Sequence, residues 1–98
     1  MLTPAAQADI NHLADYITNV LNAPNNAINK VKRIKTAIQS LATMPERQAL
    51  VRHNYLAMSG VRFLPVDNHV IFYGTSNVNV VVIMRVLLNN QDWQHLLV

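Results

Sequence analysis

The chain has 98 residues, no cysteine and a formal net charge of +3, with a pI near 9.7. This length supports one domain with a modest core, which we expect to cover residues 1–98. The lack of cysteine excludes disulfides, thiolate zinc sites and cysteine nucleophiles, and it fits a reducing cytoplasm. The basic balance indicates anionic partners such as nucleic acid or an acidic peptide.

The sequence gives no sign of a membrane protein. The N-terminus lacks a signal sequence, because Thr3 and Pro4 are followed by an amphipathic rather than a uniformly apolar stretch. The longest apolar run, from Val80 to Met84, is far too short to span a bilayer. We therefore expect a soluble, cytoplasmic protein with no membrane partner.

A first helix is predicted from Pro4 to about Leu21. Thr3 can cap a free backbone N–H group, and Pro4 suits the first helical position because its missing donor costs nothing there. Apolar residues then recur at spacings of three and four, which lines one face of a helix. They are Ala6, Ile10, Leu13, Ala14, Ile17 and Leu21.

A second helix is predicted to begin at Pro24 and to stop at Met44 and Pro45, after a loop short enough to make an antiparallel hairpin. Its apolar stripe is Ala27, Val31, Ile34, Ile38 and Leu41. Four cations fall on the flanks and back of this helix, where they form either a solvated face or an anion-binding patch. They are Lys30, Lys32, Arg33 and Lys35.

Three strands are predicted in the second half of the chain. A polar, basic connection from Glu46 to Ser59 is expected to run over the surface before them. The strands run from Val61 to Leu64, where Pro65 indicates an edge or an end, from His69 to Tyr73, and from Val78 to Leu88. Short loops join them, so they should form an antiparallel meander. From Asp92 to Val98 we expect a tail or a short helix.

The predicted fold is therefore α+β, with an N-terminal helical hairpin packed on a three-stranded antiparallel sheet. The last strand organises this fold, because a β-branched run that is apolar on both faces should be covered above and below. Arg85 interrupts that run. Its guanidinium must reach water at the rim of the sheet or find an anion, which could be a phosphate or a carboxylate.

Three segments together resemble the RelE/ParE superfamily of type II toxins. They are AQADINHLADYI from Ala6 to Ile17, GVRFLPVDNHVIFY from Gly60 to Tyr73, and VVIMRVLLNNQDW from Val81 to Trp93. Members of the family usually have a short strand before the first helix, whereas only Met1 and Leu2 precede Thr3 here. A missing strand would leave a bare sheet edge open to pairing with another chain.

The resemblance implies a toxin that inhibits growth, and it leaves three functions open. Some members inhibit DNA gyrase without hydrolytic chemistry, others cut messenger RNA on the ribosome, and a degenerate member would only bind its antitoxin. The predicted first helix of about seventeen residues favours the gyrase branch. The implied partners are a cognate antitoxin whose acidic or amphipathic segment wraps the toxin, gyrase or the ribosome with its mRNA, and operator DNA through the antitoxin alone.

In the ribonuclease alternative, Arg62 and Arg85 match arginine positions of the family and would hold a phosphate. Candidates for the acid and the base are Glu46, His53, Tyr55 and His95. In the gyrase alternative these arginines are structural or contact residues, and the basic second helix or the tail meets the target. No cofactor or metal is expected, because two glycines cannot build a phosphate-binding loop and the histidines lack close pairing.

Overall fold

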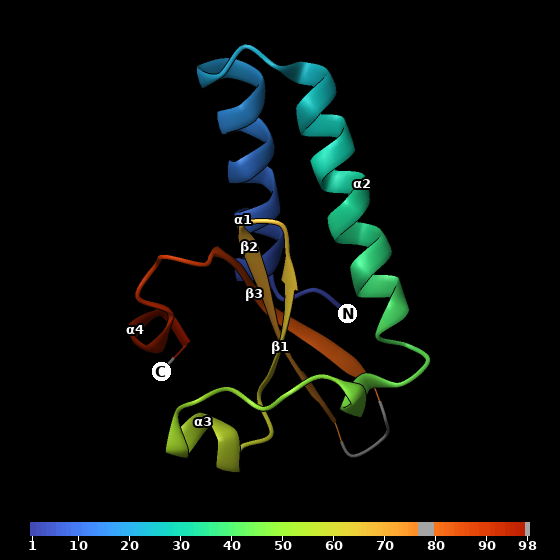
Figure 1. Ribbon diagram of the computed structural model, residues 1–98, viewed down its shortest axis with the longest axis vertical. Coiled ribbons are helices and arrows are strands. Elements are labelled where there is room, and N and C mark those ends of the chain that lie inside the picture. The colour runs from blue at the N-terminus through green and yellow to red at the C-terminus, as the bar shows by residue number, and fades with distance from the viewer. Residues whose placement is uncertain (77–79, 98) are drawn as a thin grey trace.

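A computed structural model describes residues 1–76 and 80–97. A helical hairpin stands on a three-stranded antiparallel sheet with the strand order β1-β2-β3, so the predicted α+β architecture is confirmed (Figure 1). The strands are β1 (Arg62–Val66), β2 (His69–Thr75) and β3 (Val81–Leu88). The start of the last predicted strand and part of the turn before it fall on residues 77–79, which lie outside the described residues.

The hairpin consists of α1 (Pro4–Asp15), a π-helical turn η1 (Tyr16–Val20) and α2 (Pro24–Ser40). Thr3 caps α1 as predicted, since its Oγ1 accepts the N–H group of Ala6 at 3.0 Å. Asn22 then adopts a left-handed conformation, with φ of 52°, which helps to end the first helix before Pro24 begins the second. In Figure 1 the tip of the hairpin projects well beyond the sheet.

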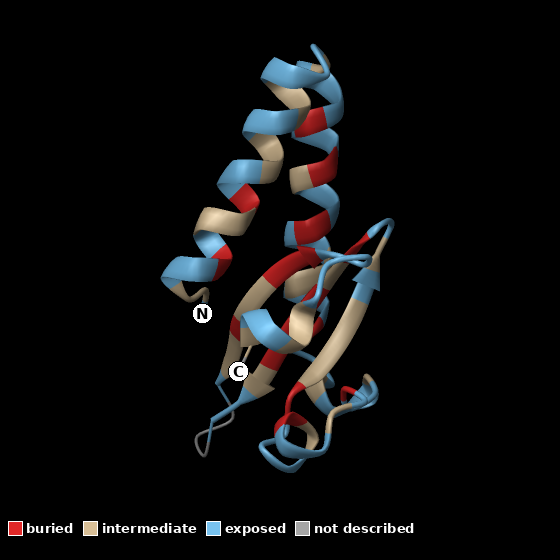
Figure 2. Ribbon diagram, turned by 90° about the vertical axis from the view of Figure 1, so that its left-hand side faces the viewer, coloured by how far each residue is buried: buried red, intermediate tan, exposed pale blue. Residues whose placement is uncertain are grey.

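The face of the sheet under the hairpin carries the larger core. Ile71 and Tyr73 of β2 and Ile83 and Val86 of β3 pack there against buried residues of both helices. Figure 2 shows the buried positions of the two helices on their facing sides and in the strands below. The predicted apolar stripes are therefore the core-facing stripes of the hairpin.

A short 3-10 turn, η2 (Pro45–Arg47), follows α2. The opposite face of the sheet is covered by α3 (Asn54–Met58), by the segment that leads into it and by α4 (Trp93–Leu97). Val51 and Leu56 are buried there against Phe72, and Trp93 stacks on Phe72 with ring centroids 5.2 Å apart. The expectation of a purely surface connection from Glu46 to Ser59 is therefore wrong. A sheet that is apolar on both faces needs a second cover, and this segment supplies it.

The outer edge of β3 is not bare, which corrects the expectation from the sequence. Leu2 forms a parallel bridge with Ile83, whose N–H group donates to the Met1 carbonyl at 2.8 Å. The Thr3 N–H group donates back to the Ile83 carbonyl at 3.0 Å. Further along the edge, the N–H group of Leu88 donates to the Gln91 side chain at 2.8 Å. An extended segment of two or three residues is thus enough to blunt this edge.

The outer edge of β1 is protected in a similar way. The N–H group of Phe63 donates to the Ala49 carbonyl at 3.1 Å, and Leu50 forms an antiparallel bridge with Arg62. Pro65 lies two residues beyond Phe63 and has no N–H group to offer. It lies inside the strand rather than closing it, but on an edge strand, as the sequence indicated. No helix within the described ranges is long and apolar enough to cross a membrane.

Candidate functional site

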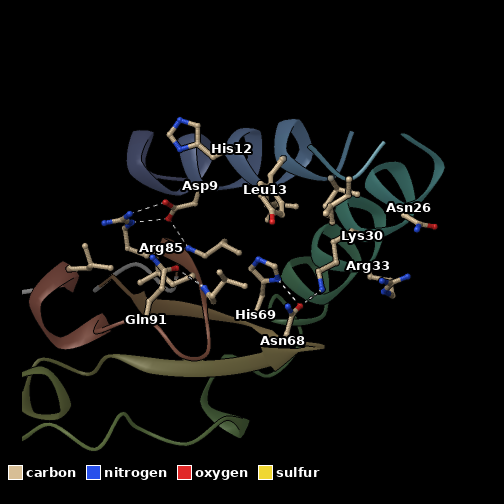
Figure 3. Close-up of a pocket in the computed structure, with 17 residues that line it drawn as sticks. Asp9, His12, Leu13, Asn26, Lys30, Arg33, Asn68, His69, Arg85 and Gln91 are labelled. Atoms are coloured by element: carbon tan, nitrogen blue, oxygen red, sulfur yellow. Dashed lines mark hydrogen bonds and ion pairs between the residues drawn. The ribbon is translucent and has the colours of Figure 1, made fainter. Parts of the chain in front are cut away.

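A groove of about 690 Å³ opens between the hairpin and the end of the sheet where β3 leads into α4 (Figure 3). It exists because the hairpin is longer than the sheet beneath it, so the outer part of α1 and η1 overhangs the strands. Leucine and isoleucine side chains line much of it. Those of the hairpin form one wall, and those of β3 and α4 face them from the other side. The main apolar lining residues are Leu13, Ile17, Leu21, Leu87, Leu88 and Leu96.

The hairpin tip above the groove is uncharged and carries exposed apolar side chains. No charged residue occurs between Asp15 and Lys30. Tyr16 and Leu21 line the groove and are 54% and 55% exposed, whereas Val20 is 63% exposed and does not line it. Exposed aromatic and aliphatic side chains beside a groove are typical of a protein interaction site.

One wall of the groove is held by a clamp between α1 and β3. Asp9 accepts two hydrogen bonds from Arg85, from Nε and Nη2, each at 2.8 Å. Its Oδ2 also accepts the backbone N–H group of Val86 at 2.9 Å. The side chains of Asp9 and Arg85 are only 10% and 23% exposed. The hydrogen bonds to Asp9 raise the pKa of Arg85 above its usual value.

A β-bulge places Arg85 at this clamp. Phe72 pairs with Arg85 and Tyr73 pairs with Ile83, so β3 carries Met84 as an extra residue. Because of this step, Ile83 and Val86 can both face the hairpin core, and Arg85 emerges at the strand edge beside α1. The sequence predicted that Arg85 needs water or an anion, and the anion is a carboxylate of the same chain.

The floor of the groove holds a second polar cluster, formed by α2 and the β1–β2 turn. The Nζ atom of Lys30 donates to Asn68 Oδ1 at 2.7 Å and to Asp67 Oδ2 at 3.3 Å. Arg33 Nε donates to the same Asp67 oxygen at 2.9 Å. His69 Nδ1 lies 3.1 Å from Asn68 Oδ1. Figure 3 shows Lys30 and His69 both directed at the side chain of Asn68.

This cluster shifts the pKa values of two of its members. The hydrogen bonds from Arg33 and then from Lys30 lower the pKa of Asp67 below its usual value. Burial lowers the pKa of His69, and the positive charge of Lys30 lowers it further, although Asp67 opposes the shift. His69 is therefore a neutral imidazole at physiological pH, held in a nearly closed site.

The four predicted target-binding cations have different environments. The side chain of Lys30 is only 9% exposed and faces inward, so its assignment to the flanks and back of the helix is wrong. Asn68 and Asp67 satisfy its ammonium group, which allows its aliphatic stem to be buried. Arg33 is exposed and paired with Asp67. Lys32 and Lys35 are exposed and make no side-chain interaction with the described residues.

The predicted ribonuclease residues are scattered over the fold. Arg62 donates to the Gln48 carbonyl at 2.6 Å and Arg85 is held by Asp9. His53 caps α3 by accepting the Leu56 N–H group at 3.4 Å, and His95 pairs with Asp92 on the exposed side of α4. Glu46 and Tyr55 are exposed on the connection below the sheet. Among the described residues, no interaction joins either arginine to one of these four candidates.

The side chain of Tyr73 has a structural role. Tyr73 is fully buried and donates its hydroxyl hydrogen to the Pro45 carbonyl, and burial raises its pKa. Tyr73 is therefore a core residue and not a catalytic base.

In the described ranges no group of three or more histidine or acidic residues could hold a metal ion.

The sequence did not single out Asp9, Asn68 or His69. Asp9 and Arg85 are 76 residues apart, so no local spacing links them. His69 did carry a signal, because His69, Ile71 and Tyr73 alternate along β2 and the latter two are buried under the hairpin. A histidine at an inward position of a strand predicts a buried, hydrogen-bonded imidazole.

The helical hairpin on an antiparallel meander is the fold that the resemblance to the RelE/ParE superfamily implied. The family model described as "ParE toxin of type II toxin-antitoxin system, parDE" matches residues 1–93. The chain therefore belongs to the ParE toxin family of type II toxin–antitoxin systems.

A solved structure supports the same fold. A chain of the "Chromosomal ParDE TA system from P. aeruginosa" is similar to this one with a TM-score of 0.73 and 21% sequence identity. The match covers 89% of this chain and 90% of that chain. A comparison with curated protein sequences finds no match. Membership of the ParE family implies a cognate ParD antitoxin as a partner.

Proposed function

We propose that this ParE family toxin arrests growth by inhibiting DNA gyrase, without hydrolytic chemistry of its own. The observation that carries the proposal is that the guanidinium of Arg85 is already bound to Asp9. Its bidentate bond to Asp9 occupies Nε and Nη2 and places a carboxylate charge against the guanidinium, which disfavours a phosphate at the same site. Metal-free RNA cleavage also needs an acid and a base near the phosphate, and among the described residues no interaction links Arg85 to any of the four candidates.

Lys32 and Lys35 are the cations of the predicted patch that remain available to a target. They project from the solvent side of α2, while Lys30 and Arg33 are engaged by the β1–β2 turn. We assign these two lysines to the gyrase contact. Free cations on a rigid helix suit a partner surface of opposite charge, and their contribution should weaken with salt.

The groove is the proposed docking site of the antitoxin. It lies next to exposed apolar side chains of the hairpin, and its lining combines leucines with the Lys30 and His69 cluster. An amphipathic segment of the antitoxin could place apolar side chains among the leucines. The antitoxin would then cover the hairpin and keep the toxin from its target.

The test of the target is a gyrase supercoiling assay with the purified toxin, run beside a cleavage assay on ribosome-bound messenger RNA. We expect inhibition in the first assay only. The double variant Lys32→Gln/Lys35→Gln should weaken inhibition about tenfold, whereas Arg47→Gln/Arg52→Gln, with the same loss of charge at exposed positions between α2 and α3, should not. Cleavage of messenger RNA without gyrase inhibition would instead establish the ribonuclease branch. No growth arrest on expression without the antitoxin would make the chain a degenerate toxin.

The test of the docking site uses calorimetric titration of the toxin with its cognate ParD antitoxin. Leu21→Gln removes an apolar side chain that lines the groove, and Val20→Gln makes the same kind of change at the neighbouring exposed position outside it. We expect Leu21→Gln to weaken binding about tenfold and Val20→Gln to change it less than threefold. Equal effects of the two variants would rule out the groove.

A further inference from the structure

The floor of the groove has a defined hydrogen-bonding polarity, which begins at Lys30. A lysine ammonium group can only donate, so the Asn68 atom that lies 2.7 Å from Nζ must be the amide oxygen. Lys30 therefore fixes the orientation of the Asn68 side chain. The amide oxygen is then directed at both Lys30 and His69.

The orientation of Asn68 in turn fixes the tautomer of His69. Asn68 Oδ1 is an acceptor, so His69 Nδ1, at 3.1 Å from it, must carry the hydrogen and donate. A neutral imidazole has only one N–H group. Nε2 of His69 is consequently a lone-pair acceptor.

This acceptor faces the groove. The His69 residue is only 7% exposed and lines the groove, and Figure 3 shows its ring pointing toward the hairpin. In the described part of the chain no fully buried side-chain nitrogen or oxygen lacks a partner. Among the described residues His69 Nε2 has no hydrogen-bond partner, so it keeps accessible surface, and the accessible space beside it is the groove.

The groups around His69 maintain this polarity. Lys30 on α2 and Asp67 in the turn are the charged groups that act on it, and Arg33 is bound to Asp67. Asp9, His12 and Arg85 also line the groove, and Asp9 and Arg85 are paired with each other. Leu13, Leu87 and Leu88 complete the surroundings. A second cation or an acceptor atom would be unfavourable at Nε2, whereas an uncharged donor would be favourable.

We propose that His69 Nε2 determines which antitoxin segment the groove accepts, by accepting a hydrogen bond from an uncharged O–H or N–H group flanked by apolar side chains. The inference rests on the proposed docking of the antitoxin in the groove. The donor is a serine, threonine, tyrosine, tryptophan, asparagine or glutamine side chain of that segment. A segment with an aliphatic residue at this point would leave the imidazole acceptor desolvated and unpaired, which costs binding free energy.

The first test needs no partner. Two-bond ¹H–¹⁵N correlation spectra of the free, ¹⁵N-labelled toxin distinguish the two imidazole tautomers. We expect the Nδ1–H form for His69. The Nε2–H form would overturn the inference, because the groove would then present a donor.

The second test compares two substitutions that each keep one half of the imidazole. His69→Asn keeps a donor near the Nδ1 position and removes the acceptor, whereas His69→Gln keeps an amide oxygen near the Nε2 position. In calorimetric titrations with the cognate ParD antitoxin, we expect His69→Asn to weaken binding about tenfold and His69→Gln to stay within threefold of the original. Circular dichroism melting curves of both variants check their folding.

The third test uses pH. Protonation converts Nε2 from an acceptor into a donor and places a second positive charge beside Lys30, so the affinity of the original toxin should fall relative to that of His69→Gln as the pH is lowered from 7.5 to 5.0. A constant ratio of the two affinities would contradict the inference. If His69→Asn binds normally while Leu21→Gln does not, the inference fails and the docking site stands. If neither variant affects binding, the docking site fails.

Discussion

The two polar clusters that flank the groove are built from similar residues and do different work. In the clamp, Asp9 and Arg85 satisfy each other through two hydrogen bonds, and the remaining capacity of Asp9 is used by the Val86 backbone. In the floor, Lys30, Asp67 and Asn68 satisfy one another, but His69 keeps an open acceptor. A closed cluster stabilises the position of an element, whereas a cluster with one open group can recognise a partner.

The difference also explains how an arginine at a family position can be structural. The side chain of Arg85 is partly buried, and its planar guanidinium matches a carboxylate through two parallel bonds. The same geometry would suit a phosphate. Asp9 determines that the role of Arg85 is structural, because it comes from α1, the helix that packs on β3. Asp9 also accepts the Val86 N–H group at the outer edge of that strand.

The largest expected effect comes from breaking the clamp. Asp9→Ala would leave the Arg85 guanidinium and the Val86 N–H group unpaired, so we expect the free energy of unfolding to fall by about 3 kcal/mol and the melting temperature by roughly 10 °C or more. Urea denaturation measures the change. Asp15→Ala, at an exposed carboxylate of the same helix, is the matched control and should change stability by less than about 0.5 kcal/mol. Similar losses in both variants would mean that the clamp is not special.

A smaller effect is expected from removing the Lys30 hydrogen bonds in the floor of the groove. Lys30→Met preserves most of the buried stem but removes the charge-assisted bonds to Asn68 and Asp67, and we expect a loss of about 1 to 2 kcal/mol. Lys32→Met, at the exposed neighbour, should have almost no effect on urea denaturation. Asn68 would also be free to rotate in Lys30→Met, so the two tautomers of His69 should become mixed in ¹H–¹⁵N spectra. A pure Nδ1–H form in this variant would mean that Lys30 does not control the tautomer.

The smallest effect concerns the pH dependence of stability. The pKa of Asp67 is lower in the folded state than in the unfolded chain, so its contribution is fully present above the unfolded value, near 4, and is lost as the pH falls through the folded value. Asp67→Asn should therefore flatten the acid limb of the stability curve below about pH 4. Thermal melts of both proteins from pH 7 to pH 2 measure this. The clamp does not depend on Asp67, so the two curves should run parallel above pH 5.

The sequence predicted the elements well because their signals are local. The apolar spacing of the hairpin, the Thr3 cap and the β-branched last strand each depend on neighbours within a few residues. The hairpin, the cap and the strand from Val81 to Leu88 are found where expected, whereas Val80 precedes the strand. The prediction that the last strand is covered on both faces is also confirmed. The segment that supplies the second cover was missed. Its buried apolar residues, Val51 and Leu56, are too few to form a periodic pattern from which burial could be predicted.

The site was predicted less well than the fold. Lys30, Arg62 and Arg85 were singled out by type and position, but their partners could not be read from spacing: Arg62 bonds a carbonyl 14 residues away and Arg85 a carboxylate 76 residues away. His69 had a periodicity that placed it inward. Its role still required Asn68 and Lys30 to be seen on either side of it.

By itself, the sequence determined the order and type of the elements, the α+β class and the resemblance to a toxin family, because periodicity and capping act over a few residues. Only the tertiary structure decided which charged groups face each other: it turned Lys30 inward, closed Arg85 on Asp9, laid Met1 to Thr3 along β3 and left one nitrogen of His69 open to the groove. The physical reason is that burying a polar group is favourable only when a partner stands opposite it, and folding brings those partners from distant parts of the chain.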